Sequence, residues 1–288
     1  MPLDRSATAE RVLPFAAMLA RQAGAQLDLI CVIDLPYELE AWLHAQDISD
    51  QRLDVEREYE QYLDSVAGSL EGVTVNRVLR AGSAADEIQK HAERLDNPLV
   101  VMCKHGRSGV RKAVVGSVTM QVIHRLGTPV IVVPSTGQVP STKLTSVLLP
   151  LDGSPFAEYA LEQGLRSLSH ADITVNLLRV VETGDVYSRR YYQFIGYVDT
   201  LAAIATDYLT KMQLRVEDSG FQVRFEIRSG DVADQIAAAA QVSEAQMIIM
   251  STHGRGRAGR FIFGSVAERV LQAATVPLML VRPRGVQH

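Results

Sequence analysis

The stretch STHGRGRAGRFIFGS, residues 251–265, recurs in related form as CKHGRSGVRKAVVGS at residues 103–117. Five positions of the two stretches are identical and lie 148 positions apart: His105 and His253, Gly106 and Gly254, Arg107 and Arg255, Gly116 and Gly264, Ser117 and Ser265. The same offset relates residues across the whole chain, among them Asp4 and Asp152, Glu10 and Glu158, Pro129 and Pro277. An offset that does not drift indicates two tandem domains of one fold.

Strands and helices alternate outward from this stretch in both copies. In the second copy we expect strands at residues 145–150, 173–181, 221–227, 247–250 and 277–281, with helices at residues 155–169, 196–218, 232–242 and 266–274. In the first copy we expect strands at residues 27–33, 73–79, 99–102 and 129–133, with helices at residues 7–23, 51–70, 84–94 and 117–126. This alternation predicts βαβ crossovers, and therefore α/β domains with mostly parallel sheets covered on both faces.

The first copy lacks most of the strand expected at residues 145–150 in the second. Met1 aligns with Leu149, so the equivalent of that strand would lie largely before the first residue. A parallel sheet without its first strand exposes apolar helix faces and unpaired backbone groups. Either the chain starts further upstream or another segment covers the gap, and of these two we favour an upstream start.

The segment PSTGQVPSTK, residues 134–143, has the composition of a linker. We therefore expect one domain at residues 1–134, a linker at residues 135–144 and a second domain at residues 145–288. The chain of 288 residues is long enough for two domains that each bury a core of their own.

Composition and charge argue against several classes of partner. The net charge of −4 gives no general attraction to nucleic acid or to an anionic membrane. No apolar run approaches the roughly 20 residues needed to span a bilayer, and the start MPLDRSATAER does not resemble a signal peptide. Cys31 and Cys103 are then expected to be free thiols in a reducing compartment. We expect a cytoplasmic protein with neither a nucleic-acid nor a membrane partner.

The repeated stretch joins a strand end to a helix start, which is where doubly wound sheets bind ligands. Gly254 would let a ligand approach the backbone, and the amides of Gly264 and Ser265 with the serine hydroxyl could bind a phosphate. Asp152, at the end of the first strand, would face the same crevice. Positive charge comes from the loop residues Arg255, Arg257 and Arg260, and in the first copy from Arg107, Arg111 and Lys112. The pattern predicts a nucleotide site; the alternative is that the glycines only shape a turn and the arginines are solvated.

These residues resemble the universal stress protein family in its tandem two-domain form, over nearly the whole chain. The ATP-binding signature of that family is Gly-x2-Gly-x9-Gly followed by Ser or Thr. The chain carries Ser251-x2-Gly254-x9-Gly264-Ser265 and Cys103-x2-Gly106-x9-Gly116-Ser117, so Ser251 and Cys103 replace the first glycine. The upstream motif Pro-x-Asp occurs at Pro150 and Asp152, and again at Pro2 and Asp4.

The resemblance implies two doubly wound, five-stranded parallel-sheet domains of the adenine nucleotide α-hydrolase-like type, the first lacking most of its first strand. It implies ATP as the ligand, with ADP or AMP as alternatives and Mg²⁺ only together with the nucleotide. The implied binding residues of the second copy are Pro150, Asp152, Val180, Ser251, His253, Gly254, Arg255, Gly264, Ser265 and Val266. Those of the first copy are Asp4, Val32, Cys103, Gly106, Gly116 and Ser117. The second copy is the better candidate because its first strand is complete.

The family resemblance also implies a partner arrangement. In members of the family the last strands of two domains pair edge to edge. By analogy residues 129–133 and 277–281 would pair as an internal pseudo-dimer, with a homodimer as a further expectation, and any other protein partner is unknown.

Other readings of the site are weaker. Gly254-x-Gly256-x2-Gly259 matches a dinucleotide fingerprint, but the first copy lacks it and no acidic residue ends a strand about 20 residues further on. No base or nucleophile is placed to make His105 or His253 catalytic, so we expect a binding protein, with at most weak ATPase activity, and no catalytic residue or structural metal. Two alternatives stay open: a nucleotide-free interaction scaffold of the same fold, and an ATP-pyrophosphatase-type enzyme, which would require a Ser-Gly-Gly loop where the chain has Asp152-Gly153-Ser154.

Overall fold

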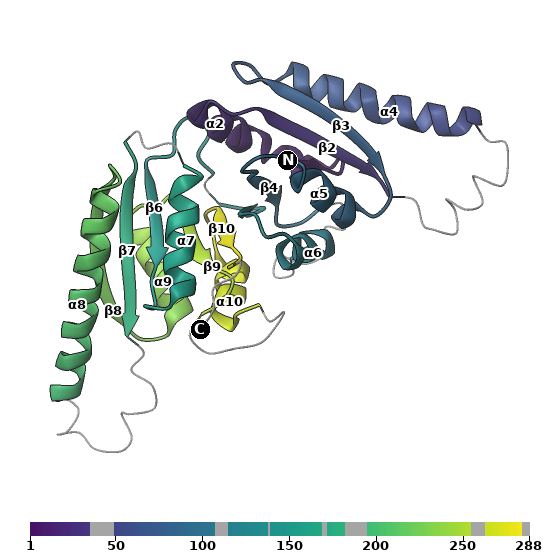
Figure 1. Cartoon of the computed structure of the whole chain (residues 1–288). Coiled ribbons are helices and arrows are strands. Elements are labelled where there is room, and N and C mark those ends of the chain that lie inside the picture. The colour runs from purple at the N-terminus through teal and green to yellow at the C-terminus, as the bar shows by residue number, and fades with distance from the viewer. Residues whose placement is uncertain are drawn as a thin grey trace. The chain divides into compact units, whose positions relative to one another are not determined.

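The structure, a computed structural model, describes residues 1–34, 49–106, 115–137, 139–168, 172–181, 195–254 and 263–283. The chain divides into two compact units (Figure 1). The first comprises Met1–Ser135 with Pro140–Lys143, and the second comprises Thr136–Val139 with Leu144–His288. The segment expected as a linker is thus shared between the two units. No described helix combines the length and the apolar character that crossing a bilayer requires.

The second unit contains the predicted five-stranded parallel sheet, and its strand order is β10-β9-β6-β7-β8. Progress along this order reverses at β6, so right-handed crossovers place α7 and α8 on one face of the sheet and α9 and α10 on the other. The elements are β6 (Ser146–Pro150), α7 (Pro155–Arg166), β7 (Thr174–Val181), α8 (Ile195–Glu217), β8 (Gln222–Ser229), α9 (Val232–Val242), β9 (Met247–Ser251), α10 (Ser265–Ala273) and β10 (Leu278–Val281).

The first unit repeats this order of elements, with its ladders in two groups: β1-β2-β3 and β4-β5. The elements are β1 (Pro2–Leu3), α1 (Ala7–Glu10), α2 (Leu13–Ala23), β2 (Leu27–Ile33), α4 (Ser49–Gly68), β3 (Val75–Ala81), α5 (Ala84–Ala92), β4 (Val100–Cys103), α6 (Ser117–Arg125) and β5 (Val130–Val133). In the second unit β6 pairs with β9 through Val147 and Leu148, whose equivalents would precede Met1. Because β1 has only two residues, it pairs with β2 but forms no ladder with β4 in the described residues, as expected for a unit that lacks most of its first strand.

One helix of the first unit is broken where the sequence predicted a single helix at residues 7–23. The structure has α1 ending at Glu10 and α2 beginning at Leu13, with Pro14 in the first turn of α2. Proline has no N–H to donate to the carbonyl of Glu10 and its ring clashes with the preceding turn, so the helix restarts there. The equivalent position in the second unit is Glu162, and α7 runs without a break.

Helix α7 approaches the sheet closely at Gly164. A Cβ placed on Gly164 would lie 2.5 Å from Cγ2 of Ile249 in β9. The equivalent positions of the first unit carry Ala16 and Val101, so a larger helix residue goes with a smaller strand residue. The strand residue therefore fills more of the space between helix and strand in the second unit, and the helix residue fills more of it in the first.

We expect Gly164→Ala to destabilise the second unit by about 1–3 kcal/mol through overpacking, even though alanine favours the helix by up to about 1 kcal/mol. Adding Ile249→Val, which copies the first unit, should recover only part of this loss, because it removes Cδ1 of Ile249 but keeps the Cγ2 that a Cβ at position 164 meets. Urea unfolding of the two single variants and the double variant measures the coupling. Additive effects would show that the two positions do not share this space.

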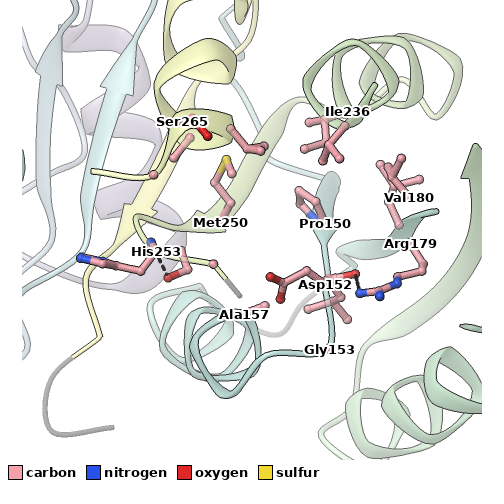
Figure 2. Close-up of a pocket in the computed structure, with 18 of the residues that line it drawn as sticks. Pro150, Asp152, Gly153, Ala157, Arg179, Val180, Ile236, Met250, His253 and Ser265 are labelled. Atoms are coloured by element: carbon pink, nitrogen blue, oxygen red, sulfur yellow. Dashed lines mark hydrogen bonds between the residues drawn. The ribbon is translucent and has the colours of Figure 1, made fainter. Parts of the chain in front are cut away.

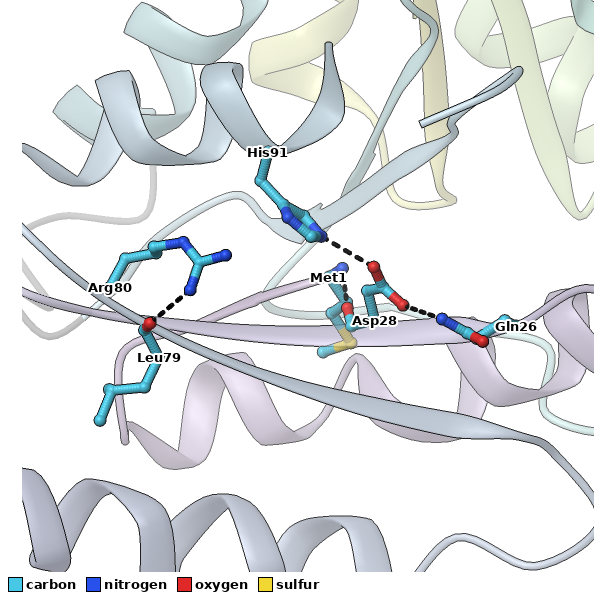
Figure 3. A network of polar contacts seen from close by, with 6 residues as sticks. All are labelled: Met1, Gln26, Asp28, Leu79, Arg80 and His91. Atoms are coloured by element: carbon cyan, nitrogen blue, oxygen red, sulfur yellow. Dashed lines mark hydrogen bonds and ion pairs between the residues drawn. The ribbon is translucent and has the colours of Figure 1, made fainter. Parts of the chain in front are cut away.

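A partly buried polar network joins Met1, Gln26 and His91 to Asp28 in the first unit (Figure 3). The Asp28 carboxylate lies 2.8 Å from Nε2 of His91 in α5 and accepts a hydrogen bond from Nε2 of Gln26 at 2.7 Å. The Met1 amino group donates to the Asp28 carbonyl at 2.6 Å. In the second unit the equivalent residue, Asn176, instead donates to Ser146 Oγ and to the carbonyl of Val147 on β6.

The contribution of the Asp28 carboxylate to the free energy of unfolding depends on pH and is lost in acid. Burial alone would raise the pKa of Asp28, but hydrogen bonds from Gln26, His91 and Asn76 outweigh it and lower the pKa below the ordinary value of 3.8. The stabilisation is therefore present above about pH 4 and is lost as the pH falls through the native pKa.

We expect Asp28→Asn to lower the free energy of unfolding of the first unit by about 1.5–3 kcal/mol at pH 7, the range for hydrogen bonds to charged groups. The difference between wild type and variant should shrink as the pH falls below about 4. Urea unfolding from pH 3 to pH 7, read through hydrogen exchange of β2 amides, measures it. A difference that does not change with pH would contradict the assignment.

Candidate functional site

A cavity of about 980 Å³ lies at the carboxyl ends of β6, β7 and β9 in the second unit (Figure 2). Its size is at the upper end of the roughly 300–1,000 Å³ typical of small-molecule sites, and its place is the crevice where open α/β sheets bind ligands. Arg255, Arg257 and Arg260 lie outside the described residues. Nine predicted site residues line the cavity: Pro150, Asp152, Val180, Ser251, His253, Gly254, Gly264, Ser265 and Val266.

Asp152 organises the turn after β6. Its Oδ1 accepts hydrogen bonds from the backbone N–H of Ser154 at 2.9 Å and from Ser154 Oγ at 2.6 Å. Ser154 Oγ in turn accepts from the N–H of Ala157 at 3.2 Å and caps α7. The second oxygen, Oδ2, faces the loop after β9, where a Cβ on Gly254 would lie 3.2 Å from it. Glycine at position 254 thus allows the loop backbone to come close to this carboxylate.

Helix α10 begins at the other side of the cavity. Gly264 is its N-cap, with extended backbone, and no described side chain caps the helix. The N–H of Gly264 donates to the Thr252 carbonyl at 2.9 Å and closes the base of the loop. The Gly264 amide is therefore not the phosphate donor that the sequence suggested, because it is used within the protein. The donors at this end are the amides of Ser265 and Val266, at a helix N-terminus that favours an anion.

Strand β7 extends past the end of β6. The β6–β7 ladder ends at Pro150 opposite Leu178, whereas β7 continues to pair with β8 as far as Val181. In a strand, the N–H and the C=O of one residue point to the same side, and the groups of residues i and i+2 point to the same side as each other. The Leu178 carbonyl accepts from Leu151 on the β6 side, so Val180 turns its N–H and C=O to that side as well, beyond the last residue of β6.

Arg179 explains why the ladder stops there. Its Nη1 donates to the Leu151 carbonyl at 3.0 Å, which is the acceptor that a longer ladder would offer to Val180. The β6 chain then turns away through Asp152. The N–H and C=O of Val180 consequently face the cavity as an adjacent donor and acceptor.

The two residues that replace the first motif glycine both fix the start of their loop. Ser251 Oγ accepts from the N–H of His253 at 3.1 Å, and Cys103 Sγ donates to the His105 carbonyl at 2.6 Å. Burial, and to a lesser degree Asp4, raises the pKa of Cys103 to about 11. This thiol is protonated near neutral pH, which favours a structural role over a redox role.

His253 lines the cavity and is held by its neighbours. Its Nδ1 lies 2.8 Å from Thr252 Oγ1, and its ring centroid lies 6.2 Å from that of Phe156 on α7. Burial and the positive charge of Arg282 lower the pKa of His253 below 6.5, so the imidazole is neutral at pH 7. These contacts suit a residue that shapes the loop.

Sequence analysis missed the apolar wall of the cavity. One face of α8, with the helical spacing i, i+3, i+4 and i+7, supplies Leu201, Ile204, Ala205 and Tyr208. Ile204 is 61% exposed although it is apolar. The side chains of Val180, Ile236, Pro150 and Met250 converge on the same space from β7, α9, β6 and β9 (Figure 2). The helical spacing within residues 196–218 was the available signal for this wall.

Acidic groups lie at both ends of the cavity. Burial, then the Glu158 and Asp152 carboxylates, raises the pKa of Tyr208, so its hydroxyl stays protonated. Glu268, in the first turn of α10, also lines the cavity. Within the described part of the chain, no group of three or more His, Cys, Asp or Glu residues could hold a metal ion.

The first unit repeats these contacts around its own predicted residues. Ser6 donates to Asp4 Oδ1 through its N–H at 3.1 Å and its Oγ at 2.5 Å, and Ser6 Oγ caps α1. Gly116 donates to the Lys104 carbonyl at 2.9 Å. Ser117 begins α6, and Val32 is the residue before the end of β2. A Cβ on Gly106 would clash with Asp4 Oδ2, whereas a Cβ on Gly254 would lie 3.2 Å from Asp152 Oδ2.

Comparison with known proteins places this architecture in one family. The sequence model described as "Universal stress protein family" matches residues 1–134 and again residues 143–282. A universal stress protein of Mycolicibacterium smegmatis is 28% identical over 223 residues, which cover 75% of this chain and 72% of that protein. One of Mycobacterium tuberculosis is 29% identical over 202 residues, covering 68% of this chain and 64% of the relative.

A solved structure agrees at the level of the fold. The crystal structure of a universal stress protein from Archaeoglobus fulgidus matches with a TM-score of 0.74 at 24% identity. The match covers 98% of this chain and 96% of that one, so the similarity extends over both units.

Proposed function

The chain belongs to the universal stress protein family, and we propose that its second half binds an adenine nucleotide, ATP above all, as the signal of a stress-response regulator. The observation that carries this proposal is the cavity itself, because its two ends suit the two ends of a nucleotide. One end is apolar and presents the backbone donor and acceptor of Val180. The other end presents the amino terminus of α10, whose N-cap residue, Gly264, has no side chain to cap it.

The base would lie at the apolar end. Met250, Ile236 and the α8 face provide an apolar surface for a flat ring. The N–H of Val180 can donate to adenine N1, and its carbonyl can accept from the adenine amino group. Ribose and phosphates would then extend past Asp152 and Gly254 toward Ser265, where the helix dipole favours negative charge.

Mg²⁺ would enter with the phosphates rather than through a preformed site of protein ligands. The chemistry of the site favours binding over turnover, since the role suggested for each residue is to position the ligand. We expect ATP hydrolysis, if measured, to be slow compared with nucleotide release.

Mass spectrometry of the purified protein under non-denaturing conditions tests the proposal. We expect adenine nucleotide to accompany the chain, or to bind when ATP is added to nucleotide-free protein. Asp152→Ala should weaken this binding, because it removes the carboxylate and also the two hydrogen bonds that hold Ser154, the N-cap residue of α7. A folded protein that takes up no adenine nucleotide at millimolar ATP would instead support the scaffold alternative.

A further inference from the structure

The two units differ at the mouth of the site in the residue after the motif aspartate, which is Arg5 in the first unit. It occupies the position of Gly153, which lines the cavity of the second unit. Both residues have left-handed backbone, with φ of 64° at Arg5 and 78° at Gly153. Glycine adopts this conformation freely, whereas an arginine is strained in it. Strain of this kind is retained mostly where it serves a function.

The Arg5 side chain connects two elements whose equivalents are separate walls of the cavity. Its guanidinium lies 4.6 Å from the ring centroid of Tyr59 and 3.6 Å from the Glu58 carboxylate, both on α4. Helix α4 corresponds to α8, which supplies the apolar wall in the second unit. Arg5 therefore ties the turn after β1 to the helix that would have to admit a base. An exposed ion pair and a cation–π contact add little stability, so stability alone does not explain the strained residue.

The interior of the first unit also suits a nucleotide less well. The Tyr62 hydroxyl is buried near Glu10 and Asp4, as the Tyr208 hydroxyl is near Glu158 and Asp152, so the two tyrosines are equivalent. One turn earlier, Ile204 and Ala205 of α8 correspond to Glu58 and Tyr59 of α4, so a carboxylate and a large ring replace two apolar side chains. The Asp4 carboxylate lies against Gly106, as described above, which leaves less room at the loop than at Gly254.

We propose that the chain holds one nucleotide, in its second half, and that Arg5 closes the equivalent site of the first half. This inference rests on the proposed function, because it assigns the binding to one of two related sites. The Arg5 side chain then occupies the space that a nucleotide would need in the first half, and only the second half binds the nucleotide.

Titration calorimetry with ATP on nucleotide-free protein, backed by mass spectrometry of the intact complex, measures the stoichiometry. We expect one ATP per chain for the wild type. Arg5→Gly and Arg5→Ala should each allow a second, weaker ATP, since both remove the side chain and only the first also removes the strain. Gly153→Arg should lower ATP affinity in the second half at least tenfold, and at least tenfold more than Gly153→Ala does, because the alanine adds the backbone strain without a long side chain.

The outcomes separate this inference from the proposed function. A wild type that binds no ATP overturns the proposed function, and with it the inference. Two ATP molecules bound to the wild type leave the proposed function standing and overturn the inference. A stoichiometry that stays at one in both Arg5 variants, or a folded Gly153→Arg protein that binds like the wild type, shows that an arginine at this position does not close the site. Hydrogen exchange of β2 and β7 amides confirms that each variant is folded.

Discussion

Replacing Gly264 with valine is expected to lower the affinity of the second half for ATP by about a hundredfold or more. A Cβ at this position would lie 3.2 Å from the Thr252 carbonyl, and a branched side chain needs more room still. The first turn of α10 must then move, and with it the amides of Ser265 and Val266 that would meet the phosphates. Two hydrogen bonds to a charged group are worth about 1.5–3 kcal/mol each, which corresponds to about two to four powers of ten in affinity.

Gly116→Val is the matched control for this variant. It makes the same change at the equivalent residue of the first unit, where a Cβ would lie 3.4 Å from the Lys104 carbonyl. We expect it to leave ATP affinity unchanged, because binding is assigned to the second half. Calorimetric titration of both variants decides the matter. If Gly264→Val binds ATP as the wild type does, the phosphates do not lie at the start of α10.

ATP is expected to bind at least about 30-fold more tightly than GTP. Adenine offers an acceptor at N1 beside a donor amino group, which complements the N–H and C=O of Val180. Guanine presents the reverse order, a donor at N1 and an acceptor at O6, so both backbone groups would be left without partners. Each buried unpaired group costs about 1–3 kcal/mol, and two such losses amount to about 30-fold to 10⁴-fold.

Competition of GTP against a fluorescent ATP analogue measures this ratio. Val180→Pro removes the N–H on the cavity side while β7 keeps its ladder with β8 through its other residues, and it should reduce the preference for ATP over GTP. Val180→Ile changes only the side chain and should retain the preference. Equal affinities of the wild type for ATP and GTP would contradict recognition by these backbone groups.

Much of the fold could be predicted because the elements repeat with a constant offset. The strand at residues 27–33 and the helix at residues 232–242 have the bounds expected from the sequence. The break between α1 and α2 was missed because the apolar pattern continues through residues 7–23 and masks the effect of Pro14. A shortened first strand was expected, but the division of the first sheet into the groups β1-β2-β3 and β4-β5 was not predicted, since it depends on which residues of β1 face β4.

The candidate site could be predicted only in part. The motif residues of the second copy meet in one cavity because strand ends and helix starts share one edge of the sheet. The hydrogen bond of the Gly264 amide to Thr252 could not be read from spacing, since it depends on how the loop closes. The apolar α8 face follows from side chains far from the motif. The role of Arg5 becomes visible only through its backbone angle and its contact with Tyr59.

One main-chain bond in each half, from Gly116 to Lys104 and from Gly264 to Thr252, joins the strand end directly to the helix start. Since that junction uses backbone atoms only, the bond that closes it requires no particular side chain at residues 107–114 or 255–262. Lengthening a segment whose ends are already held costs little free energy, because closure entropy grows slowly with length. These stretches can therefore be exchanged as cassettes, which makes the fold a convenient frame for engineering new ligand or docking specificity.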